Sequence, residues 1–211
     1  MIMKMELIEN CEKYVRQLFD EKLPASMYFH NIDHTLSVVA ATERLLSELT
    51  VSDSDKQIVL VAAWLHDTGY CYTYEGHEAI SMTLAGDFLR NEQRSDLFIS
   101  EVNYCIRATR FPPSPVRQTH SIICDADMAH LSSPYYPELT ELLRKEWEVH
   151  LGQTYTEQDW DKLNLRFLST HRYFTSAGQS NWESGKMSNL RSLERKVQRS
   201  DDDPLYPEDK P

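Results

Sequence analysis

The chain has 211 residues, a length that fits one domain of ordinary size. Its 41% hydrophobic and 26% charged residues are typical of a globular protein, and its 6 Gly and 9 Pro exclude a collagen-like or low-complexity architecture. The net charge of −11 opposes the attraction to phosphate on which general nucleic-acid binding relies. A small anionic substrate is compatible with this charge, because a bound cation or a few basic side chains can reverse the field locally.

No part of the chain has the pattern of a targeting or membrane segment. The N-terminus carries acidic residues from Glu6 onward and has no apolar core of the kind that a signal peptide needs. The longest apolar run covers 58–65, far short of the roughly 20 residues that cross a bilayer. The four cysteines are widely spaced and form no C-x-x-C pair, so neither a zinc knuckle nor a disulfide framework is indicated. We therefore expect a cytoplasmic protein with reduced thiols and no membrane contact.

Apolar residues recur at helical spacing through almost the whole chain. Pro24 ends the first periodic stretch, and Ser52 with Asp55 forms the capping-box pattern that opens the third. No segment shows the alternation typical of a strand, so the sequence predicts an all-α protein. The expected helices cover residues 7–19, 36–49, 52–65, 76–91, 95–109, 117–131, 138–150, 156–174 and 181–197.

These segments predict one domain over residues 1–197, a single helical bundle of about eight or nine helices. The last residues, 198–211, are acidic and rich in proline, and we expect them to form a disordered tail. The sequence leaves the oligomeric state open, with a homodimer as one common arrangement.

The first polar side chain at an expected core position is His34. It precedes Val38 by four positions and Ala41 by seven, which places it on the buried stripe of the second helix. A polar ring on such a face needs a partner, because an unpaired polar group is costly to bury. Considered alone, His34 could be an ordinary core histidine bound to a backbone carbonyl.

A histidine and an aspartate directly follow the apolar run of the third helix. His66 and Asp67 come after Leu65, and Thr68-Gly69 then turns the chain away. Neighbouring helical residues point about 100° apart, so these two side chains reach a single ion only when it lies over the helix end. A His-Asp pair is common by chance, and it becomes informative only together with other ligands.

Two carboxylates follow another apolar run further along the chain. Asp125 and Asp127 come after the apolar residues 122–124. Asp125 could cap a helix, and Asp127 could be a favourable charge in its first turn. Together with the two histidines, these carboxylates would instead complete a mixed nitrogen and oxygen site suited to Mn²⁺, Fe²⁺, Co²⁺, Ni²⁺, Mg²⁺ or Zn²⁺.

The order of these residues resembles the H…HD…D signature of the HD-domain metal-dependent phosphohydrolase superfamily. The likeness extends to four stretches, which are His30 to Thr35, 62–70, Gly76 to Glu78, and 125–127. In the residues of the motifs and in their spacing, residues 5–195 are similar to a bacterial branch of predicted HD phosphohydrolases. The resemblance implies a helical HD-domain bundle and a metal-dependent hydrolase.

The resemblance also implies a set of metal ligands. They are His34, His66, Asp67 and Asp127. Related families place the last ligand after a small residue, as in Ala126-Asp127, which favours Asp127 and leaves Asp125 as a capping or supporting group. A clear second downstream histidine is missing near 108–110, where one would be expected for two metals. We therefore expect one divalent ion.

Further roles around the ion are implied by the same resemblance. Asp67 would be both ligand and proton acceptor, and Glu78 would orient water. Lys186 is a further catalytic candidate. Basic groups would also neutralise the charge that develops on phosphorus, and we expect Arg110 and Arg144, together with His30 and His77, to contact substrate. For each of the Lys and Arg residues, a solvated surface charge is the competing interpretation.

We expect a hydrolase that cleaves a phosphate ester or anhydride of a nucleotide or another small phosphorylated metabolite, using a metal-activated water. A first alternative keeps the metal but makes the protein a nucleotide sensor or regulatory module with little or no catalysis. A second alternative is a helical interaction protein in which the motifs are coincidental.

Overall fold

The computed structural model describes residues 2–201, and within them it contains nine α-helices, two 3-10 helices and no β-strand. The all-α class is thus confirmed. The α-helices are α1 (Ile2–Lys22), α2 (Ile32–Glu48), α3 (Asp53–Leu65), α4 (His77–Asn91), α5 (Asp96–Ala108), α6 (Gln118–Asp127), α7 (Tyr136–Leu151), α8 (Glu157–Thr170) and α9 (Ser176–Asp201). The 3-10 helices are η1 (Thr68–Cys71) and η2 (Met128–Ser132). In this part of the chain, no helix is both long enough and apolar enough to span a bilayer.

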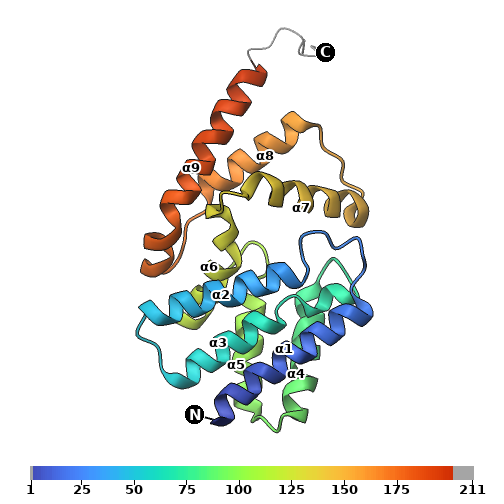
Figure 1. Cartoon of the computed structure of the whole chain (residues 1–211), viewed down its shortest axis with the longest axis vertical. Helices are drawn as coiled ribbons and strands as arrows, with labels where there is room; N and C mark the ends of the chain where they lie inside the picture. Colours follow the sequence, from blue (N-terminus) through green and yellow to red (C-terminus); the bar gives the residue numbers. More distant parts are fainter. Residues whose placement is uncertain (1, 202–211) are drawn as a thin grey trace.

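The helices form two groups along the long axis of the molecule (Figure 1). Helices α1 to α6 lie together at the end that holds the N-terminus, and α7, α8 and α9 lie toward the other end. The chain passes from the first group to the second through α6 and η2. α9 ties the groups together, because it packs on α8 and η2 and also contacts α2 and α6.

The central helix of the first group is α3. It packs against α1, α2, α5 and α6. Its apolar residues extend around the whole helix, and Val59, Val61, Ala62, Ala63 and Leu65 are completely buried. A helix that is apolar on all sides is stable only when other helices cover it. The polar pair that follows Leu65 is therefore held inside the bundle.

Two predicted helices end earlier than their apolar pattern suggested. The predicted helix over 117–131 ends at Asp127, where the chain tightens into η2. The side chain of His130 bonds to the carbonyl oxygen of Asp127 at 2.9 Å and stabilises this tighter turn. The predicted helix over 156–174 ends at Thr170, because the backbone becomes extended at His171.

The last helix is longer than predicted in both directions. α9 begins at Ser176 rather than at 181, because the hydroxyl oxygen of Thr175 accepts a hydrogen bond from the amide of Gly178 at 2.9 Å. It continues to Asp201, past the predicted domain end at 197. The rest of the predicted tail, 202–211, lies outside the described residues.

Gly69 lets α4 approach the turn that follows α3. A Cβ at this position would lie 2.0 Å from the backbone oxygen of His77 and 2.9 Å from Ser81 Oγ. Because no Cβ is present, the amide of Gly69 donates a hydrogen bond to Ser81 Oγ at 2.8 Å. The first turn of α4, including His77, is thereby held against the end of α3.

We predict that Gly69→Ala destabilises the protein, because the added methyl group must displace α4. Overpacking of this kind costs about 1–3 kcal/mol. The matched control is Gly86→Ala within α4, where a Cβ would meet its nearest neighbour, the Arg90 side chain, at an ordinary 3.5 Å. Alanine is favoured over glycine in helices by about 0.5–1 kcal/mol, so the control should be as stable as the parent or slightly more stable. Urea unfolding measures both changes, and equal stabilities of the two variants would contradict the role given to Gly69.

Candidate metal centre

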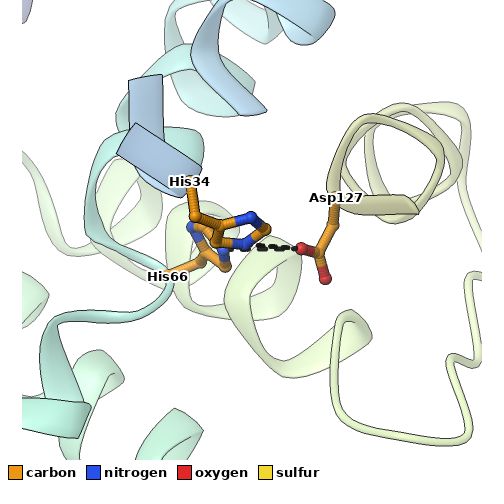
Figure 2. A group of neighbouring side chains, drawn as sticks. All are labelled: His34, His66 and Asp127. Carbon is orange, nitrogen blue, oxygen red and sulfur yellow. Dashed lines mark ion pairs between the residues drawn. The ribbon is translucent and has the colours of Figure 1, made fainter. Parts of the chain in front are cut away.

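Four polar side chains from separate parts of the chain meet at the C-terminal end of α3. Figure 2 shows His34 and His66 facing the carboxylate of Asp127. His34 Nε2 lies 3.1 Å from Asp127 Oδ1 and 3.4 Å from Asp67 Oδ2. His66 Nε2 lies 3.1 Å from Asp67 Oδ2 and 3.7 Å from Asp127 Oδ1. The structure therefore brings the four predicted ligands together.

Local hydrogen bonds set the direction of these side chains. Asn31 Oδ1 accepts from the amides of Asp33 at 2.9 Å and His34 at 3.3 Å, so α2 begins at Ile32 rather than at 36. This cap places His34 in the first turn of α2. After α3, the hydroxyl of Thr68 donates to the carbonyl oxygen of Leu65 at 2.8 Å, which folds the chain over the helix end.

The donor atoms fit a divalent cation. His34 Nε2, His66 Nε2 and Asp67 Oδ2 are buried and have no hydrogen-bond partner in the described part of the chain. His66 Nδ1 bonds to the carbonyl oxygen of Ala63 at 2.9 Å, so the neutral ring carries its proton there and turns the lone pair of Nε2 toward the carboxylates. One donor atom from each of His34, His66 and Asp127 lies within 4.8 Å of the other two, and Asp67 Oδ2 lies 3.4 Å and 3.1 Å from the two imidazoles. A cation would satisfy all three unpartnered atoms at once.

In the absence of a cation, the two carboxylates favour protons on the two imidazoles. Burial lowers the pKa of His34, but Asp127 and Asp67 outweigh burial and raise this pKa to about 9. Burial also lowers the pKa of His66, and the charge of Asp67 reverses this and raises it well above the usual value. Burial would raise the pKa of Asp67, but the charge of His66 holds it well below its usual range. Protons and a cation compete for these atoms, so metal binding would release protons.

Asp125 makes a different set of contacts from Asp127. Its Oδ1 accepts from the amide of Phe174 at 2.7 Å, and its Oδ2 accepts from the amide and the hydroxyl of Thr175 at 2.8 Å and 2.7 Å. A Cβ at Gly178 would lie only 2.5 Å from Asp125 Oδ2, so glycine is needed for this approach. Asp125 thus anchors the start of α9, while Asp127 faces the two histidines.

His130 supports Asp127 from the side of η2. Its Nδ1 bonds to the carbonyl oxygen of Asp127, and its ring centre lies 6.3 Å from that of His34. Burial, followed by the nearby charge of His34, lowers the pKa of His130 to about 4, so this ring stays neutral. The sequence assigned no role to His130, because nothing in the helical pattern points to its contact with Asp127.

Two residues of α4 lie beside the outer oxygen of Asp67. His77 Nε2 is 3.6 Å from Asp67 Oδ1 and 3.8 Å from Glu78 Oε1. His77 Nδ1 bonds to the carbonyl oxygen of Tyr74 at 3.1 Å, which orients the ring toward Asp67. The predicted residue His77 therefore lies next to Asp67, and the predicted residue Glu78 lies next to His77.

His30 belongs to the same wall of the centre. Its ring centre lies 5.6 Å from that of His34, and its ring stacks on Tyr70 at 4.4 Å. The other face of Tyr70 stacks on His77 at 3.7 Å. His30, Tyr70 and His77 thus form a continuous stack of rings beside the ligands.

A carboxylate that the sequence analysis missed holds His30. Glu146 Oε1 on α7 lies 2.6 Å from His30 Nδ1, and Glu146 is completely buried. Glu146 follows Leu142 by four positions and Leu143 by three, so it is a charged residue on an apolar stripe. The same kind of signal drew attention to His34.

Lys186 is engaged away from these ligands. Its ammonium group donates to the carbonyl oxygen of His171 at 2.8 Å and pairs with Glu183 at 2.9 Å. It also lies 5.3 Å from the centre of the Tyr173 ring. Lys186 is completely buried, and these contacts satisfy its charge. They connect α9 to the segment that precedes it, and the catalytic role of Lys186 stays a prediction.

The two predicted substrate-binding arginines differ in their surroundings. Arg144 donates to the carbonyl oxygen of Tyr155 and pairs with Glu141 at 3.4 Å. It lines a cavity of about 800 Å³ between α7, α8 and α9 that contains none of the four converging residues. Arg110 is exposed just after α5. Neither guanidinium group forms an ion pair with the converging carboxylates among the described residues.

Residues 31–130 match the family model of the HD domain. The matched segment runs from the cap of α2 into η2, and it includes all four converging side chains as well as His77 and Glu78. Helices α7 to α9, and with them Glu146, lie outside it. No match was found to a curated protein or to a solved structure.

The contacts of the two aspartates lead to opposite expectations for Asp127→Asn and Asp125→Asn. In the parent, Mn²⁺ or Zn²⁺ at a hundred times its Kd should add about 2.7 kcal/mol to the free energy of unfolding. Asp127→Asn should lose most of this gain, because it removes a ligand. Asp125→Asn should keep the gain but lower the metal-free stability by about 1–3 kcal/mol, because the start of α9 loses its acceptor. Thermal unfolding with and without metal measures both, and the reverse pattern would make Asp125 the ligand.

His171 should make stability depend on pH. Burial and then the charge of Lys186 lower the pKa of His171 to about 4, whereas an unfolded histidine titrates near 6.5. Between these values the unfolded chain binds more protons, so the parent loses stability as the pH falls through this interval. In His171→Gln the free energy of unfolding should fall less steeply from pH 6.5 to 4, as measured by urea unfolding of chelator-treated protein. Identical slopes for parent and variant would show that His171 does not titrate in this way.

Proposed function

Because residues 31–130 are an HD domain, we propose that this protein is a metal-dependent phosphohydrolase. Its substrate is a phosphate ester or anhydride of a nucleotide or of another small phosphorylated metabolite. The supporting observation is the meeting of three buried donor atoms without hydrogen-bond partners, His34 Nε2, His66 Nε2 and Asp67 Oδ2. These atoms lie 3.1 Å and 3.4 Å from each other across the two histidine–Asp67 contacts.

We assign one divalent cation to His34, His66, Asp67 and Asp127. When bound, such a cation lowers the pKa of a coordinated water and polarises a phosphoryl oxygen. With neutral imidazoles the two carboxylates leave two negative charges, which a divalent cation balances. The mixed nitrogen and oxygen donors suit Mn²⁺, Fe²⁺, Co²⁺, Ni²⁺, Mg²⁺ or Zn²⁺.

Asp67 has one oxygen for each of two tasks. Its Oδ2 faces the imidazoles of His34 and His66, and its Oδ1 faces His77. The outer oxygen can therefore accept the proton that the attacking water loses. Glu78, which is partly exposed beside His77, can orient that water.

We assign contacts with the substrate to His77 and His30. Both rings belong to the stack beside Asp67, and with Nδ1 bound to Tyr74 or Glu146 their Nε2 atoms can accept hydrogen bonds from the substrate. We assign no substrate contact to Lys186 or Arg144, whose charged groups are bound elsewhere. Arg110 receives none either, because it is exposed after α5.

We also propose that the protein acts in the cytoplasm on a small molecule. All four cysteines are free, and Cys11, Cys105 and Cys124 are buried. Free thiols are the normal state of cysteine in a reducing compartment.

The test is phosphate release from mono-, di-, tri- and cyclic nucleotides with Mn²⁺, Mg²⁺ or Co²⁺, after the metal content of the protein has been determined. We expect turnover on at least one class. Asp67→Asn should lower kcat roughly a hundredfold to ten-thousandfold, because it removes the proton acceptor and weakens the metal site. The control Asp87→Asn changes an exposed carboxylate of α4 that pairs with Arg90 at 2.7 Å, and it should keep the parental rate. A metal-loaded parent with no turnover on any class would instead favour a sensor.

A further inference from the structure

Glu146 reaches from α7 to the segment that precedes α2. Its Oε2 accepts hydrogen bonds from the amides of Phe29 at 2.8 Å and His30 at 3.0 Å. Its Oε1 lies 2.6 Å from His30 Nδ1 and accepts a longer bond from the hydroxyl of Tyr74 at 3.4 Å. One completely buried carboxylate thus holds both the backbone and the ring of His30.

These contacts determine which nitrogen of His30 carries a proton. A buried carboxylate needs donors, because an unpaired charge is costly to bury. Burial would raise the pKa of the Glu146 carboxyl, but the bond and the charge of His30 lower it, so Glu146 is an acceptor. Nδ1 of His30 must then be the donor, and Nε2 is the nitrogen left for other partners.

The ring of His30 has little freedom to turn away from this arrangement. Its face is covered by Tyr70, and its edge lies against the ring of His34, with centres 5.6 Å apart and planes 83° to each other. Nε2 lies 3.4 Å from the hydroxyl of Tyr70, on the side of the ring opposite to Glu146. Nε2 therefore lies beside Tyr70 in the stack of rings next to the four converging side chains.

We infer that Glu146 is a positioning residue of the active site, which fixes His30 so that its Nε2 faces the substrate as a hydrogen-bond acceptor. This inference rests on the proposed function and adds a residue of α7, outside the HD match, to the machinery of that site. Glu146 does not touch substrate, and it acts through His30.

The first test is a double-mutant cycle on the best substrate of the phosphate panel. Glu146→Gln keeps the size of the side chain, but it replaces one of the two accepting oxygens with an NH2 group, which cannot accept a hydrogen bond. We expect kcat to fall about tenfold to a hundredfold, as is usual for a residue that orients a functional histidine, with KM and Mn²⁺ affinity within about threefold of the parent. In a His30→Gln background, Glu146→Gln should have no further effect. The matched control is Glu148→Gln, an exposed glutamate of the same helix, which should leave kcat unchanged.

Two outcomes of the cycle would overturn the inference. If the losses of Glu146→Gln and His30→Gln multiply in the double variant, Glu146 acts independently of His30. If Glu146→Gln lowers the melting temperature but keeps the kcat of Glu148→Gln, its role is only to anchor α7.

The second test needs no turnover, and so it separates a failure of this inference from a failure of the proposed function. Nitrogen-15 NMR of histidine-labelled, Zn²⁺-loaded protein reports which ring nitrogen is protonated, and the His30 signals are those missing from His30→Gln. In the parent we expect a protonated, hydrogen-bonded Nδ1 on His30, and in Glu146→Gln the loss of that signature. A parental His30 without a proton on Nδ1 would overturn the inference even if Glu146→Gln does not fold.

Discussion

Burying polar atoms without hydrogen-bond partners is costly, and this protein buries three of them at one point. These atoms are buried because the second half of α3 is covered by other helices and its C-terminal end lies inside the bundle. His66 and Asp67 are almost completely buried there. Without an ion, protons on the imidazoles balance the carboxylates, so a cation that binds here replaces these protons.

The rest of the molecule keeps this point fixed. The first group of helices supplies the four converging side chains, and the second group contacts the segments that carry them. Asp125 and Asp127 divide this work on one helix, since Asp125 binds the residues that start α9 while Asp127 faces the imidazoles. Glu146 makes a corresponding connection from α7 to His30. The C-terminal helices thus contact the segment that matches the HD-domain model.

The sequence predicted the ligands because their residue types conflict with the apolar pattern around them. His34 lies on a buried stripe and His66-Asp67 ends a buried helix, and both conflicts are visible without a structure. The contact of Glu146 with His30 was not predictable in this way, because 116 positions separate the two residues and no local pattern pairs them. Lys186 and Arg144 show a related limit, since helical periodicity does not tell where a long charged side chain ends. Lys186 donates to the backbone carbonyl of His171, and Arg144 donates to the backbone carbonyl of Tyr155.

The claim that one cation joins these distant side chains is tested most directly by anomalous X-ray diffraction from crystals grown with Mn²⁺. We predict one strong peak, bound by Nε2 of His34 and of His66 and by carboxylate oxygens of Asp67 and Asp127. A peak elsewhere, or no peak at the end of α3 in a folded protein, would contradict it.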